Sequence, residues 1–175
     1  MFALDEKVVY PGHGVAQVSR IIEKNIAGQT TKFFELKFIN KDMTILVPVS
    51  NLASVGIRRL SSPDMIEEIF KMLSQPFGYH PESTGTNWNK RNKEYQGKLR
   101  TGNLADICKI YRDLKQISSH KELSFGEKHL LQQTELLLAQ EIALVKKVSE
   151  EIMVQQLRSL CAQPTFTSSS MQKTI

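Results

Sequence analysis

The sequence predicts an α+β protein in which a small β-barrel of the Tudor or SH3 type, over residues 1–60, is followed by an all-α helical domain over residues 61–162. Two observations support this division. The first 60 residues contain four or five short segments in which apolar and polar residues alternate between turn residues. From Ser62 onward, the spacing of the apolar residues changes from two to about 3.6, which is the period of an α-helix.

Extended segments joined by tight turns make up the predicted barrel. The expected strands are residues 7–10, 15–22, 31–38 and 43–49. A hairpin loop over residues 25–29 joins the second strand to the third, in which Phe34, Leu36 and Phe38 share one face. Pro48 favours an edge position for the last strand, because proline has no N–H to donate to a neighbouring strand.

Four helices are predicted in the second half. They begin at Ser62 and Pro63, near Trp88, at Leu104 and after Ser124, and they end near Gln75, Gly102, Ser118 and Lys147. The segment from Ser124 to Glu127 fits a capping box, in which each side chain accepts a backbone N–H of the other residue. Residues 149–162 can continue as helix, residues 76–86 are expected to form an exposed connection, and the tail over residues 163–175 is expected to be disordered.

Composition limits the kinds of protein that the chain can be. With 175 residues and 41% hydrophobic content, it can fold around one sizeable core or two small ones. Its net charge of +5 favours polyanionic partners. Charged residues interrupt the N-terminal segment at Asp5, Glu6 and Lys7, and the chain has no apolar run long enough for a membrane helix, so we expect a cytoplasmic protein. Cys108 and Cys161 lie too far apart for a zinc motif, and we expect reduced thiols.

The sequence lacks the motifs of common enzymes. It contains no glycine-rich phosphate loop, no HExxH metal motif and no nucleophile elbow. The four histidines are scattered; His13, in the segment PGHG, is interpreted as a turn residue, with a contact or ligand role as the alternative. We therefore expect no catalytic residues, no metal and no cofactor.

The single tryptophan lies in the densest run of positive charge. Trp88 is followed closely by Lys90, Arg91 and Lys93, and the segment continues to Arg100 with five basic residues against one acidic residue. Such a run is either a solvated helix face or a surface for phosphates, because the release of counterions favours their binding.

Helical geometry leaves the position of Trp88 open. At 100° per residue, Tyr95 lies only about 20° from Trp88 around the helix, and Leu99 is also close. The indole therefore either packs with these two residues in a core or stands exposed as a functional anchor.

Three segments keep a recognisable order along the chain. VVYPGHGVAQV lies near the N-terminus, ILVPVSNLASVGIR ends the predicted barrel, and TNWNKR is followed by LSFGEK in the helical half. Together they resemble the CarD family of bacterial transcription regulators over about residues 5–148. The YPxHG element also occurs in the RNA-polymerase-interacting domain of transcription-repair coupling factors, but the helical half and the lack of helicase motifs favour CarD.

The resemblance implies a protein with two binding partners. Its Tudor-like half would bind the β subunit of RNA polymerase, and its helical half would contact promoter double-stranded DNA at the upstream edge of the transcription bubble. The tryptophan that matches Trp88 acts in that family as a minor-groove wedge, which holds the duplex distorted and so stabilises the open promoter complex. Such a protein would be monomeric and associated with the nucleoid through RNA polymerase.

On the DNA side, the resemblance assigns basic positions around the tryptophan. Arg91 and Lys93 match basic positions beside the wedge and would contact phosphates, where they position the protein without reading the base sequence. Lys90, in the same basic run, is also assigned to DNA. Lys128, near the start of the capped helix, also matches a basic position that faces DNA. Its alternative role is that of a solvated helix charge.

On the polymerase side, Lys24 and Ile26 match the hairpin region that makes the contact. Leu46 falls where relatives can carry an arginine. A leucine cannot bind a carboxylate through two hydrogen bonds, so this part of the interface would be weaker, more apolar or differently arranged. Alternatively, Leu46 is a strand residue that packs inside the barrel.

A second function class also fits the sequence. In a protein-interaction adaptor, the barrel would dock on RNA polymerase and the helical half would recruit another protein without a functional DNA contact. Weak DNA affinity with little salt dependence would distinguish this adaptor from a DNA-binding factor. A nucleic-acid-modifying enzyme is the third possibility, and no catalytic motif supports it.

Overall fold

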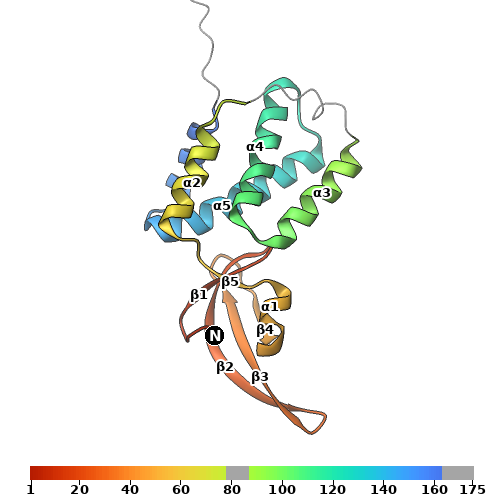
Figure 1. Cartoon of the computed structure of the whole chain (residues 1–175), viewed down its shortest axis with the longest axis vertical. Coiled ribbons are helices and arrows are strands. Elements are labelled where there is room, and N and C mark those ends of the chain that lie inside the picture. The colour runs from red at the N-terminus through yellow and green to blue at the C-terminus, as the bar shows by residue number, and fades with distance from the viewer. Residues whose placement is uncertain (78–86, 163–175) are drawn as a thin grey trace, which may run out of the picture.

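The computed structural model describes residues 1–77 and 87–162. The strands in this part of the chain are β1 (Lys7–Tyr10), β2 (Gly14–Ile26), β3 (Gln29–Phe38), β4 (Thr44–Pro48) and β5 (Arg58–Arg59), with a 3₁₀ turn (Val49–Asn51) and the one-turn helix α1 (Leu52–Val55) between the last two. The longer helices are α2 (Pro63–Ser74), α3 (Trp88–Thr101), α4 (Leu104–His120), α5 (Phe125–Lys146) and α6 (Glu150–Leu160). The predicted fold class, a small antiparallel β-structure followed by helices, is confirmed (Figure 1).

The five strands form one antiparallel sheet in the order β4-β3-β2-β1-β5. Strand β4 lies at one edge of the sheet, as predicted from the presence of Pro48. The β2–β3 hairpin is longer than expected, because pairing continues to Ile26 and Gln29 and leaves only Ala27 and Gly28 in the turn. Both turn residues have positive φ, 51° and 82°, which matches the right-handed twist of a two-residue hairpin. The hairpin therefore projects as a continuous ribbon (Figure 1).

The sheet has its own small core. The three residues predicted to share a face, Phe34, Leu36 and Phe38, are all buried. They pack with Val8, Ala16, Val18, Val47 and Ile57. His13 lies in the turn between β1 and β2, as expected; its amide donates to the Tyr10 carbonyl, 3.0 Å away, and its ring packs edge-on against the tyrosine ring.

Side-chain caps start the helices where the sequence predicted them. The Ser62 hydroxyl accepts the Met65 amide at the start of α2, and both hydrogen bonds of the capping box between Ser124 and Glu127 are present at the start of α5. Residues 149–162 are largely helical but belong to a separate helix, because Lys147 adopts the left-handed conformation and ends α5. The one-turn helix α1 was not predicted. The expected connection over residues 76–86 lies largely outside the described residues, and the expected disordered tail over residues 163–175 lies wholly outside them.

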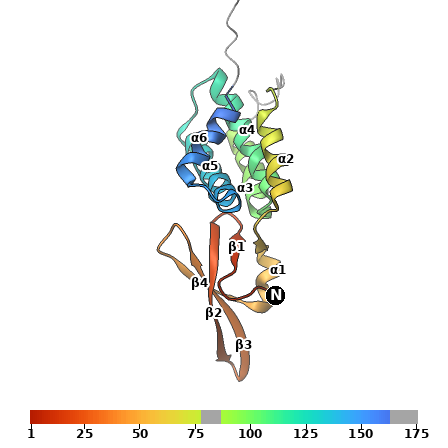
Figure 2. The same cartoon turned by 90° about the vertical axis from the view of Figure 1, so that its left-hand side faces the viewer.

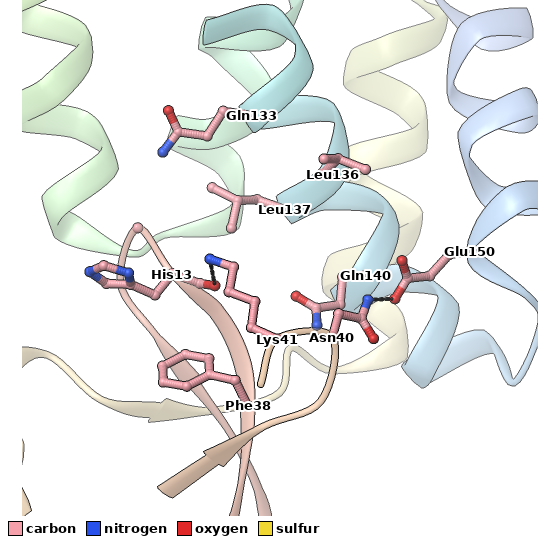
Figure 3. Close-up of a pocket in the computed structure, with 10 residues that line it drawn as sticks. His13, Phe38, Asn40, Lys41, Gln133, Leu136, Leu137, Gln140 and Glu150 are labelled. Atoms are coloured by element: carbon pink, nitrogen blue, oxygen red, sulfur yellow. Dashed lines mark hydrogen bonds between the residues drawn. The ribbon is translucent and has the colours of Figure 1, made fainter. Parts of the chain in front are cut away.

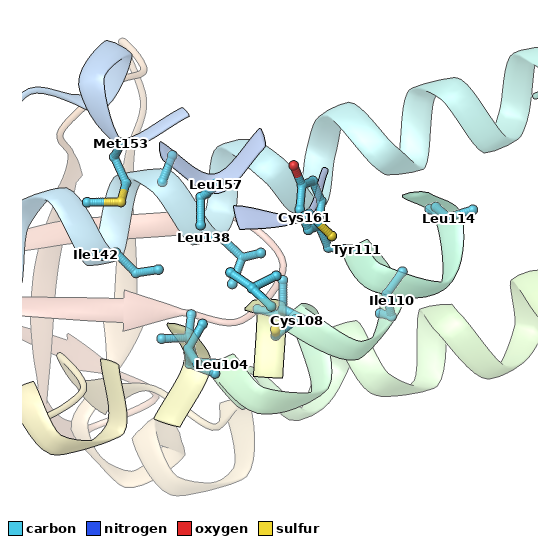
Figure 4. Packing of buried hydrophobic residues seen from close by; sticks show 14 of the residues in the cluster. Leu104, Cys108, Ile110, Tyr111, Leu114, Leu138, Ile142, Met153, Leu157 and Cys161 are labelled. Atoms are coloured by element: carbon cyan, nitrogen blue, oxygen red, sulfur yellow. The ribbon is translucent and has the colours of Figure 1, made fainter. Parts of the chain in front are cut away.

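Helices α2 to α6 surround the larger core (Figure 4). Its largest fully buried side chain is Tyr111 of α4, which packs among residues of the same helix and of α5 and α6. The α4 positions predicted as core are all buried: Ile107, Cys108, Ile110, Tyr111 and Leu114. Helices α4 and α5 therefore form the centre of the helical domain.

The sheet and the helices lie end to end (Figures 1 and 2). Helix α5 makes the principal polar contact between them through Glu141, which is almost fully buried. The Arg58 guanidinium donates to both carboxylate oxygens of Glu141, at 2.7 and 2.8 Å, and to the Gly102 carbonyl at 2.8 Å. The backbone amide and the hydroxyl of Ser61 also donate to Glu141. One carboxylate thus ties the last strand and the linker to the helical domain.

A second polar contact lies beside the first. The Gln140 side chain accepts the Val15 amide at 3.1 Å, and it fits only because residue 14 is glycine. Gly14 has a φ of 105°, and a Cβ atom there would collide with the Gln140 amide. Next to this contact is a cavity of about 260 Å³ between β3 and α5, across which Asn40 donates a hydrogen bond to Glu150 (Figure 3).

The Arg58 contact gives a test of the junction. We expect Arg58→Ala to lower the free energy of unfolding by about 3 kcal/mol, because it leaves the Glu141 carboxylate buried without its cationic partner. Arg59→Ala is the matched control, because Arg59 pairs with Glu6 at the surface, and it should cost less than about 1 kcal/mol. Urea unfolding of the three proteins makes the measurement. Equal losses in the two variants would contradict a special role for Arg58.

Candidate nucleic-acid and polymerase interfaces

Trp88 begins α3 at the end of the helical domain that is farthest from the sheet (Figure 1). The Asn87 side chain caps the helix by accepting the Asn89 amide. Helix α3 has 14 residues, a length of about 20 Å, and its other end, at Gly102, lies against Pro11 in the turn between β1 and β2. Trp88 and the sheet are therefore separated by the full length of a helix.

The indole is half-buried. The prediction that it packs in a core and the alternative that it stands exposed are therefore each met in part. Tyr95 and Leu99 are buried in the helical core, and Trp88 packs against the edge of that core. On the other side it meets Gly126 of α5, where a Cβ atom would lie 3.0 Å from Cζ2 of the indole. A larger residue at position 126 would push the ring outward. The indole is thus held at the surface in one place, with part of it open to solvent.

Arg91 does not lie where a phosphate contact was expected. Its side chain is buried, with 8% of the residue exposed, and its guanidinium donates to Glu127 of α5 at 2.7 Å. The guanidinium carbon also lies 5.7 Å from the centre of the Trp88 ring, within cation–π distance. Arg91 was expected to contact phosphates from the surface, but it instead makes a buried contact that joins Trp88 and α3 to α5. The physical reason is that a buried carboxylate such as Glu127 requires a cation beside it.

Glu127 binds several donors at once. One carboxylate oxygen accepts the Ser124 amide at 2.8 Å, and the other accepts Arg91 and lies 3.5 Å from the Lys121 ammonium. Burial alone would raise the pKa of Glu127, but the hydrogen bonds from Ser124 and Arg91 and the charges of Lys121 and Arg91 outweigh it and lower the pKa. Glu127 is therefore held as a carboxylate, and it anchors the start of α5 to the first turn of α3.

The three lysines assigned to DNA are all exposed. Lys90 and Lys93 lie about 200° and 140° around α3 from Trp88, so they occupy the solvent side of the helix. Lys128 lies in the first turn of α5 and pairs with the exposed Glu122 at 3.0 Å, a surface pair that costs little to exchange. A ligand that contacted all three lysines and the indole would have to cross the beginnings of α3 and α5.

The three residues assigned to RNA polymerase lie on the sheet, away from the helices. Lys24 and Ile26 are exposed near the tip of the β2–β3 hairpin. Leu46 of the edge strand β4 is also exposed, which excludes the alternative that it packs inside the sheet. It lies opposite Glu35, which in turn pairs with Arg20, so an exposed guanidinium shares this face of the sheet with Leu46.

The buried polar residues of α5 were missed by reasoning from sequence. Glu135 accepts the Tyr111 hydroxyl at 3.0 Å and the Arg158 guanidinium at 2.7 Å, and Glu141 and Gln140 make the junction with the sheet. A signal for them existed, because Glu141 falls within the apolar spacing set by Leu138 and Ile142. A carboxylate at such a position requires a buried partner, but the sequence does not say which one.

The described residues offer little chemistry beyond these contacts. Burial raises the pKa of the Cys108 thiol to about 12, which keeps it protonated and inert. Within residues 1–77 and 87–162, no group of three or more histidine, cysteine or acidic residues is placed to hold a metal ion. No helix of that part of the chain is long and apolar enough to span a membrane.

A sheet with an exposed hairpin at one end and a helix with a half-buried tryptophan and exposed lysines at the other is the arrangement expected of a binding protein with two surfaces. Residues 2–61 match the family model described as the CarD-like/TRCF RID domain, and residues 68–158 match the C-terminal domain of CarD. The chain therefore belongs to the CarD family, a family of transcription regulators with an RNA-polymerase-interacting domain rather than a family of enzymes.

Two individual proteins are similar to the chain. "Putative transcription factor YdeB" of Bacillus subtilis (strain 168) is 26% identical over 152 residues, which cover 86% of this chain and 96% of the relative. The solution NMR structure of the 72-residue N-terminal domain of Myxococcus xanthus CarD is 32% identical, with a TM-score of 0.30, and covers 34% of this chain and 79% of that domain. The similarity to YdeB thus extends over both the sheet and the helices.

The lowered pKa of Glu127 gives a second test. At about neutral pH we expect Glu127→Gln to lower the free energy of unfolding by about 3 kcal/mol, because the buried pair with Arg91 is lost. Because the folded pKa lies below the ordinary 4.5, the carboxylate contributes fully above that pH and less as pH falls through the folded value. The difference between wild type and variant should therefore shrink on acidification.

Urea unfolding at several pH values measures this difference, and the emission of Trp88, the single tryptophan, reports on the site itself. Glu94→Gln, at an exposed position of α3, is the control and should change neither quantity. A difference between wild type and Glu127→Gln that stayed constant from neutral to acidic pH would contradict the assigned ionisation.

Proposed function

We propose that this protein docks on the RNA polymerase β subunit through its sheet and contacts promoter DNA at the upstream edge of the transcription bubble through its helical domain. Trp88 acts as a minor-groove wedge that stabilises the open complex. The observation that carries this proposal is the placement of the indole: it is half-buried, held between α3 and Gly126, and separated from the sheet by the length of α3.

The wedge mechanism depends on a ring that does not move. Inserting an apolar side chain at a base step costs a few kcal/mol of stacking energy, which contacts with the distorted duplex must offset. Trp88 loses little conformational freedom on binding, because Gly126 and the Arg91 guanidinium already restrict it in the free protein. A held indole can thus prevent the two strands from pairing again at that step.

Phosphate contacts come from the exposed lysines and not from Arg91. Lys90 and Lys93 on the solvent side of α3 and Lys128 in the first turn of α5 are open to solvent near the helix ends that hold the indole. Contacts of this kind position a protein on the duplex without reading its sequence. Arg91 instead serves as a positioning residue, because its guanidinium contacts both the indole and Glu127.

The polymerase contact uses the opposite end of the molecule. Lys24 and Ile26 combine one charge and one exposed apolar side chain near the hairpin tip, and Leu46 adds an apolar position on the edge strand. An edge strand with free backbone groups can pair with a strand of a partner. With Leu46 in place of an arginine, this contact relies on apolar area there, and Arg20 supplies the guanidinium on the same face.

Trp88→Ala tests the wedge. We expect this variant to bind RNA polymerase as the wild type does and to shorten the lifetime of the open complex by about tenfold or more, since removal of a stacked aromatic residue costs about 1–3 kcal/mol. Lys24→Glu is the contrasting variant and should weaken binding to the polymerase. Open-complex lifetime on a promoter fragment, measured with a competitor after assembly, makes the comparison. A wild-type lifetime with Trp88→Ala would rule out the wedge.

Salt dependence distinguishes this function from that of a protein adaptor. Affinity for duplex DNA should fall steeply as salt rises, and Lys128→Glu or Lys93→Glu should reduce the slope of log K against log salt by about one. Lys71→Glu, at an exposed position of α2, is the matched control and should leave the slope unchanged. Weak binding with no salt dependence in the wild type would favour an adaptor that recruits another protein.

A further inference from the structure

A phenyl ring at the start of α5 is exposed to solvent. Phe125 is the first residue of α5, and 87% of its surface is open to solvent. Among the large apolar residues in the described part of the chain, only the terminal Met1 is more exposed. Burial of a phenyl ring contributes about 2 kcal/mol of stabilisation, which an exposed ring does not gain. The exposed position of Phe125 is therefore suited to contact with a partner.

The backbone on both sides of Phe125 is fixed. Ser124, which precedes it, forms the capping box with Glu127, and Gly126, which follows it, is the residue that touches the indole of Trp88. Consecutive Cα atoms are about 3.8 Å apart, so Phe125 starts one residue away from the contact with Trp88. Phe125 is therefore the chain neighbour of the residue that touches Trp88, although 37 positions separate the two aromatic residues in the sequence.

The charges around this aromatic pair favour a polyanion. Lys90, Lys121 and Lys128 are exposed on the segments that begin or end here. Of the nearby carboxylates, Glu127 is buried against Arg91, and Glu122 is paired with Lys128. Apolar rings with lysines around them suit nucleic acid, since the rings stack on bases and the lysines meet phosphates. A protein partner for an exposed phenyl ring would not require this excess of positive charge.

We propose that Phe125 is a second aromatic contact to promoter DNA, and that it packs against the base step next to the one held by Trp88. This inference rests on the proposed function and adds a residue to it. Two adjacent rings on a fixed backbone would keep two neighbouring steps unstacked, so the strands would have to close over a longer distance before they could pair again.

Phe125→Ala tests the assignment, because the side chain is exposed and its loss should leave unfolding by urea unchanged. We expect the variant to lower affinity for a promoter duplex by about five- to tenfold, as expected when a base loses an aromatic partner. The salt slope should stay that of the wild type, because no charge is removed. Open-complex lifetime should fall by a similar factor, and polymerase binding without DNA should not change. Ile152→Ala, an exposed apolar residue on α6, is the matched control and should behave as wild type.

Three outcomes would overturn the inference. If Phe125→Ala keeps wild-type affinity and lifetime while Trp88→Ala shortens the lifetime, the second contact is wrong and the proposed function stands. If both variants keep the wild-type lifetime, the wedge itself is wrong. If Phe125→Ala weakens polymerase binding in the absence of DNA, the ring belongs to a protein interface.

Discussion

Helix α5 holds the molecule together through two buried carboxylates. Glu127 near its start binds Arg91 of α3, and Glu141 near its end binds Arg58 of the sheet. Fourteen positions separate them, which places them about 21 Å apart and within about 40° of the same helix face. The two ion pairs therefore tie α3 and the sheet to opposite ends of one helix.

Such ion pairs serve geometry more than stability. Burying two charges costs several kcal/mol of desolvation, and their mutual attraction roughly offsets that cost. The loss of one partner is strongly destabilising, because the other charge then stays buried without a partner. The pairs therefore restrict the molecule to one arrangement. Under the proposed function, that arrangement decides which base step the indole reaches. A longer-lived open complex would help a promoter limited by opening and hinder one limited by escape.

Local signals in the sequence predicted the fold well and the buried contacts poorly. The capping box at Ser124, the shared face of Phe34, Leu36 and Phe38, and the edge position of β4 all follow from short-range rules of propensity and hydrogen bonding. In the sequence, Arg91 cannot be distinguished from the other residues of the basic run. It is buried because it pairs with Glu127, which lies 36 positions away along the chain. Likewise, nothing in the pair Arg58 and Arg59 tells which one faces the helices.

The contact between Trp88 and DNA is the central claim, and site-specific photocrosslinking tests it most directly. A benzophenone amino acid at position 88, in an open complex assembled with RNA polymerase, should attach to promoter DNA within a few nucleotides of the upstream edge of the bubble. The same group at the exposed position 152 should leave the DNA unlabelled. Crosslinks from position 88 that appeared only on a polymerase subunit would contradict the account.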